Sequence, residues 1–245
     1  MRYDTYKMNI KETTACVLIW IAVSVFFSYF FYKSMLASIV LFLFFPLFLK
    51  YARSFLKQKR NWEMTLEFKE LIRIVATNLQ SGSSPENAFA NAYRDMEKLY
   101  GRKSHITKEC EIIVRGLENN IVLEELISSL GERSGREEIS EFAEIFSIAK
   151  RSGGNLKEII SDTTEVIDSR IEMKREFRIL ISSKKFEHRI MCLIPFVILV
   201  YIGVTSPGYF DILYGNISGI LIMSACLAVY TGAFLWGEHI VNLKI

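Results

Sequence analysis

Long uncharged apolar runs flank a charged, helically periodic middle in this chain of 245 residues. The uncharged runs cover about residues 13–32, 34–49, 190–206 and 216–236. A helix needs about 20 mainly apolar residues to cross a bilayer, and each run approaches that length. The pattern therefore predicts four transmembrane helices, two N-terminal and two C-terminal, each pair joined by a short connection.

The middle of the chain has apolar residues three and four positions apart, which is the spacing of an amphipathic helix. Turn signals divide it into about six helices, near residues 61–81, 84–100, 105–119, 122–133, 136–152 and 156–189. No segment alternates with the period of a strand, so no sheet is expected. Short connections favour antiparallel neighbours, and we therefore expect an all-α fold with an up-and-down bundle between the membrane pairs.

Two turns in the middle have strong local signals. Ser84 is a suitable N-cap, and Pro85 follows at the first helical position, where its missing N–H is tolerated. Gly153 or Gly154 can adopt the left-handed conformation of a helix C-cap, and a new apolar stripe begins at Leu156. This last helix is expected to continue directly into the third membrane segment.

Charge divides the chain into three parts, residues 1–49, 50–189 and 190–245. The central part holds 25 of the 30 Lys and Arg residues and 23 of the 27 Asp and Glu residues. Its cations gather at 50–60 and 174–189, beside the membrane segments, whereas the 207–215 loop has none. By the positive-inside rule, both termini and residues 50–189 are expected in the cytoplasm of a bacterial inner-membrane protein.

Little in the sequence indicates chemistry. The three histidines are far apart, no phosphate-binding loop or zinc-protease motif is present, and the four cysteines lack metal-ligand spacing. We therefore expect no enzymatic activity, no cofactor, no metal and no nucleic-acid partner. The membrane segments contain no interior Asp, Glu, Lys or Arg, although ion-driven transporters usually need one.

The segment around the double glycine resembles the second half of the type II secretion system F domain. The matching positions are Gly153, Gly154, Leu156, Ile159 and Ile160. A first helical turn and a loop between the last two spans also resemble this family, at Leu79, Gly82, Ser84, Ala88, Pro207, Tyr209 and Phe210. The chain has one such bundle, as in the single-domain TadB and TadC platform proteins of Flp (Tad) pili.

The resemblance implies a non-enzymatic assembly platform in the inner membrane. Such a platform binds a hexameric cytoplasmic secretion ATPase and couples its motion to the assembly of pilin subunits. A single bundle implies a second copy or a paralogous F-domain membrane protein as a further partner. The TadB and TadC roles both remain open. Two alternatives also remain: a stator or channel subunit of the MotA/ExbB type, and a membrane-anchored signalling scaffold.

An acidic stretch offers a candidate docking face for the ATPase. Residues 109–144 contain ten glutamates and three arginines, a net charge of −7. The proposed face consists of Glu124, Glu125, Glu137 and Glu138. The alternative interpretation is that these acids only keep a helical surface soluble. Complementary charge would speed and orient an encounter with a basic partner more than it would tighten the complex.

Overall fold

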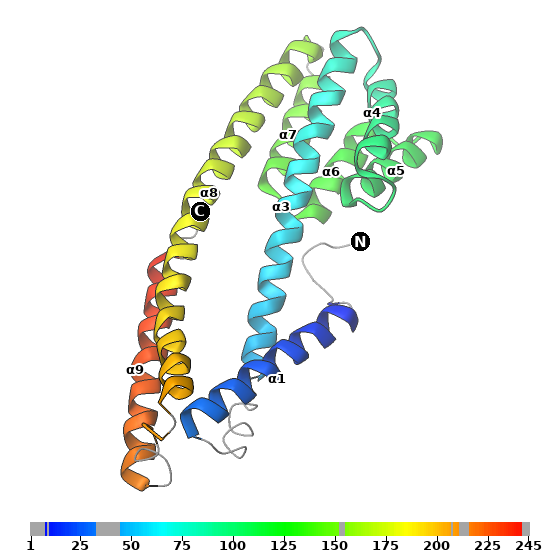
Figure 1. Cartoon of the computed structure of the whole chain (residues 1–245). Coiled ribbons are helices and arrows are strands. Elements are labelled where there is room, and N and C mark those ends of the chain that lie inside the picture. Colours follow the sequence, from blue (N-terminus) through cyan, green and yellow to red (C-terminus); the bar gives the residue numbers. More distant parts are fainter. Residues whose placement is uncertain are drawn as a thin grey trace. The chain divides into compact units, whose positions relative to one another are not determined.

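The computed structural model describes residues 8, 10–32, 45–151, 155–206, 208–210 and 216–241. These residues form eight α-helices and no strand, so the all-α class is confirmed for the described part of the chain (Figure 1). The helices are α1 (Ile10–Tyr32), α3 (Phe45–Gln80), α4 (Pro85–Tyr100), α5 (His105–Glu118), α6 (Leu123–Ser134), α7 (Glu137–Arg151), α8 (Leu156–Thr205) and α9 (Ile217–Val241).

The described residues belong to two compact units. The bundle unit contains Arg53–Met173, and the apolar unit contains the described residues of Met8–Ala52 and Lys174–Ile245. Helices α3 and α8 each contribute to both units. The six predicted helices of the middle segment correspond to α3 to α8, with ends that agree closely except at the start of α3 and the end of α8.

Aromatic side chains from three helices meet in the core of the bundle unit. Phe68 of α3 packs edge-on against Phe142 of α7, with ring centroids 5.6 Å apart. Phe89 of α4 contacts Phe146 of α7 in the same way at 5.9 Å. All four rings are at least 98% buried, and burying such a side chain contributes roughly 1.5–3 kcal/mol.

Local signals fix the helix ends around this core. The Ser84 hydroxyl accepts a hydrogen bond from the Asn87 N–H at the start of α4, as the cap signal predicts. The chain turns before it at Gly82, whose φ of +97° favours glycine. Helix α6 ends at Gly135, which adopts the left-handed conformation.

Two helical glycines permit close contact between successive helices. A Cβ atom on Gly116 of α5 would lie 2.5 Å from a methyl carbon of Leu126 in α6. A Cβ atom on Gly131 of α6 would lie 3.2 Å from the Cα atom of Ser140 in α7. Neither distance leaves room for a larger residue without movement, so α5, α6 and α7 are packed at short range.

Three helices in the described residues are long and apolar enough to cross a membrane, rather than the four expected from sequence. They are α1, α8, whose apolar part follows residue 190, and α9. The expected second span at 34–49 lies largely outside the described residues. Its last part, 45–49, begins α3, which continues as one helix into the charged sequence up to Gln80.

Within the apolar unit, aromatic rings join the helices. Trp20 of α1 packs against Phe48 of α3, with ring centroids 5.0 Å apart. Phe196 of α8 contacts Phe27 of α1 at 5.1 Å and Tyr230 of α9 at 4.9 Å. Helix α8 continues through Pro195 without interruption.

Candidate functional site

The double-glycine turn is only partly described. Gly153 and Gly154 lie outside the described residues, so their left-handed conformation stays a prediction. The flanks agree with the expected hairpin, because α7 ends at Arg151 and α8 begins at Leu156. The Ile159 N–H donates to the Asn155 carbonyl at 3.1 Å, and Leu156 is partly buried against the bundle core.

The four glutamates of the proposed docking face have different environments. Glu125 and Glu137 are exposed at the first turns of α6 and α7. The Glu124 side chain is only 17% exposed and forms an ion pair, and Glu138 is 6% exposed. Adjacent positions on a helix point about 100° apart, so each consecutive pair separates into an outer and an inner residue. A partner approaching this surface therefore meets Glu125 and Glu137.

Lys150 joins three helices of the bundle unit. Its Nζ atom on α7 lies 2.9 Å from Glu86 of α4 and 3.0 Å from Glu124 of α6. Burial alone would lower the pKa of Lys150, but hydrogen bonds to the two carboxylates outweigh it and the pKa is raised. Burial likewise opposes ionisation of Glu86, yet the Lys150 contact holds its pKa below the ordinary value. This cluster stabilises the bundle and removes Glu124 from the surface available to a partner.

The sequence did not single out two further carboxylates, one buried and one partly buried. Glu109 of α5 is 1% exposed, and its Oε2 atom accepts from Nη2 of Arg133 in α6 at 2.6 Å. Glu67 of α3 accepts hydrogen bonds from the Ser104 hydroxyl at 2.7 Å and the Ile106 N–H at 3.2 Å. Glu67 thus satisfies free donors at the start of α5. The only sequence signal that could have identified these two glutamates was the position of each acid within an otherwise apolar helical stripe.

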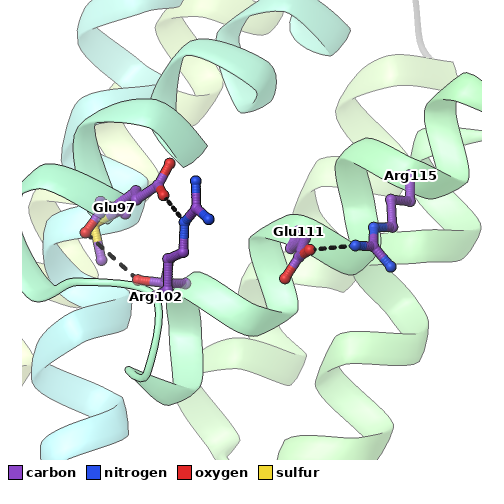
Figure 2. A network of polar contacts seen from close by, with 6 residues as sticks. Glu97, Arg102, Glu111 and Arg115 are labelled. Carbon is purple, nitrogen blue, oxygen red and sulfur yellow. Dashed lines mark hydrogen bonds and ion pairs between the residues drawn. The ribbon is translucent and has the colours of Figure 1, made fainter.

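Two other ion pairs link residues that are close in sequence, at the end of α4 and on α5. Figure 2 shows Arg102 beside Glu97, at the end of α4, and Arg115 beside Glu111 on α5. The Arg115 and Glu111 atoms are 2.5 Å apart, but the two side chains are 70% and 40% exposed. Exposed pairs of this kind contribute little to stability. They are features of a solvent-exposed helical surface.

Two grooves follow α8 inside the bundle unit. One, of about 240 Å³, lies against α3 and has a largely polar lining that includes Arg73, Ser161 and Asp168. The other, of about 460 Å³, lies against α7 and combines carboxylates with apolar side chains. Among the described residues, no group of three or more His, Cys, Asp or Glu side chains is placed to hold a metal ion.

Comparison with known families gives one match that covers more than half of the chain. The family model described as "Type II secretion system (T2SS), protein F" matches residues 68–203. The matched region begins in α3, contains α4 to α7 and ends near the C-terminus of α8. Searches of curated proteins and of solved structures found no significant match.

Proposed function

Because the chain belongs to the type II secretion system protein F family, we propose that it is the inner-membrane assembly platform of a type IV pilus of the Flp (Tad) class. The observation that supports this most directly is the continuous match over residues 68–203. The matched residues include both the helical bundle and the apolar part of α8, so the similarity extends beyond a single pair of helices. The three apolar helices support a membrane location.

We propose further that the chain acts with a second F-domain unit. The matched region corresponds to one bundle, formed by α3 to α8. A single-bundle platform of the TadB or TadC type would obtain a second bundle from another copy of itself or from a paralogous protein. In this proposal the chain is not an enzyme. Its role is to couple a cytoplasmic ATPase to the assembly of pilin subunits.

The bundle unit is the part proposed to face the cytoplasm and to contact the ATPase. A labelling experiment on a cysteine-free background tests this orientation. A cysteine at Asn216 should react with an impermeant maleimide added outside the cell, whereas a cysteine at the exposed Lys103 should react only after permeabilisation. The Lys103 side chain is exposed, whereas the side chain of the neighbouring Ser104 caps α5 and should not be replaced. The reversed pattern would refute the cytoplasmic assignment.

Binding of the cognate secretion ATPase tests the coupling role. We expect the full chain, in a neutral detergent, to bind the ATPase with an affinity that falls as salt rises. Glu125→Lys/Glu137→Lys should weaken binding and reduce its salt dependence, because these two side chains are the exposed members of the acidic face. Glu118→Lys/Glu132→Lys changes the charge equally at other exposed sites and is the control. Absence of ATPase binding by the wild-type chain would contradict the proposed coupling. Equal binding by all variants would show instead that the ATPase binds at another surface of the chain.

A further inference from the structure

The groove between α7 and α8 has apolar side chains in its lining, and one of them is mostly exposed. Ile145 of α7 and Val166 and Ile167 of α8 are among its lining residues. Ile167 is 2% exposed and belongs to the core, but Val166 is 58% exposed. Val166 therefore presents most of its side chain to the groove and to solvent, so a helix that binds there can cover it.

The exposed apolar surface extends along both helices beyond the groove. Ile148, three positions after Ile145 on α7, is 60% exposed. Met173, seven positions after Val166 on α8, is 57% exposed. With the α-helical rise of 1.5 Å, residues 162–173 of α8 extend over about 16 Å, or roughly three turns. A strip of this length matches a short helix better than a compact small molecule.

The rim of the groove is acidic. Glu141 and Glu144 of α7 and Asp162 of α8 line it, together with the single cation Arg170. Three carboxylates and one guanidinium give the lining a net charge of −2. Arg170 is 2.6 Å from Glu141 and is therefore already paired within the groove.

The remaining two carboxylates are available to a partner. Glu144 and Asp162 are exposed, and neither forms an ion pair with any residue in the described part of the chain. The nearby cation of α7, Lys150, is bound to Glu86 and Glu124 and does not neutralise the rim. The groove thus combines an uncovered apolar strip with uncompensated negative charge.

We propose that the α7–α8 groove binds a cationic amphipathic helix of a partner protein. Apolar side chains of that helix, spaced three, four and seven positions apart, would lie over Ile145, Val166 and Met173. Lysine or arginine residues flanking this stripe would face Glu144 and Asp162. Insertion of an amphipathic helix into an apolar groove is a common mode of recognition, and the acidic rim determines the charge of the helix. The groove lining includes neither Glu125 nor Glu137, so the inference goes beyond the proposed function.

Fluorescence anisotropy with a designed peptide pair tests the proposal. The probe is a labelled three-turn helix with leucine at the apolar positions and lysine at the flanking positions, and its matched control has glutamate in place of each lysine. Each peptide is titrated with the full chain in neutral detergent at low and at moderate salt. Saturable binding is expected for the lysine peptide and not for the glutamate peptide.

Variants of the chain locate the binding site. Glu144→Lys/Asp162→Lys should weaken binding of the lysine peptide at least ten-fold at low salt, and Glu144→Gln/Asp162→Asn should weaken it less. Val166→Ser should weaken binding at both salt concentrations, because it removes apolar contact area at a position too exposed to be needed for folding. Glu118→Lys/Glu132→Lys is the charge-matched control and should leave the affinity unchanged.

The alternative outcomes overturn the proposal. It is wrong if the lysine peptide does not bind saturably, if the glutamate peptide binds equally well, or if the control variant loses as much affinity as the rim variant. Sedimentation of the full chain without peptide tests a competing occupant. Self-association that disappears in Glu144→Lys/Asp162→Lys would assign the groove to a second copy of this chain instead.

Discussion

Replacing Arg133 with methionine is expected to destabilise the bundle unit by about 3 kcal/mol. The Glu109 carboxylate is 1% exposed and accepts from Arg133 at 2.6 Å. Removing one partner of a buried ion pair typically costs about 3–5 kcal/mol, because an uncompensated charge remains buried. We take the lower end of this range, since Arg133 is 23% exposed and Glu109 takes part in at least one further polar interaction.

A double-mutant cycle separates the ion pair from other effects of substitution. Glu109→Gln removes the buried charge but keeps a hydrogen-bond acceptor, so it should cost about 1–2 kcal/mol. Glu109→Gln/Arg133→Met should then be less destabilised than the sum of the single variants, with a coupling energy of at least about 1.5 kcal/mol. Methionine is suitable at residue 133 because it preserves much of the volume of the arginine stem.

Pulse proteolysis of the full chain in urea and neutral detergent measures these free energies of unfolding. Arg115→Met is the matched control, because it removes an exposed arginine from an ion pair on the surface of α5 (Figure 2). Its expected cost is below about 0.5 kcal/mol. A loss of less than about 1 kcal/mol in Arg133→Met, or single-variant effects that simply add, would refute the assignment of this pair as a buried charge pair.

Three further predictions use the same assay or a thermal melt. Burial lowers the pKa of His105, so near this pKa the folded chain binds fewer protons than the unfolded chain. The free energy of unfolding should therefore fall as the pH decreases from about 7.5 to about 5.5, and His105→Gln should reduce that fall. Ser84→Ala should cost about 1 kcal/mol by removing the N-cap of α4, and an unchanged melting temperature would contradict the capping role. Lys150→Met should cost about 2 kcal/mol at neutral pH by leaving Glu86 and Glu124 unpaired, and the difference from wild type should shrink in acid as these carboxylates are protonated.

Local chemistry made much of the bundle predictable from sequence. The start of α4 was placed correctly because Ser84 and Pro85 act through the residues next to them. The membrane-side limits of the bundle were less predictable. Charge shows that the apolar segment ends before Lys50, but residues 47–80 contain no glycine or proline, so no helix-breaking residue separates it from the charged helix. In the structure both belong to α3.

The candidate surfaces depend on tertiary packing, which sequence spacing does not supply. Glu124 and Glu125 look equivalent in the sequence, but only packing against α4 and α7 shows that Glu124 contacts Lys150. The α7–α8 groove could not be located from periodicity, because Val166 belongs to the same apolar pattern as the buried Ile167. Sequence patterns identify which residues can be buried, whereas the crossing of neighbouring helices decides which are.

The order in which the bundle helices contact one another bears on how the protein is made. Helices α4, α5, α6 and α7 each pack on their neighbour in sequence, and contacts of this kind form quickly because little chain must be closed into a loop. This part can therefore gain structure while the ribosome is still translating the rest. Helix α3 also contacts α8, whose carboxylates at 168 and 172 bind Lys69 about a hundred residues earlier, so these contacts form only after α8 has been made. Because α8 also carries an apolar segment long enough to cross a bilayer, insertion of that segment would coincide with completion of the bundle during biogenesis.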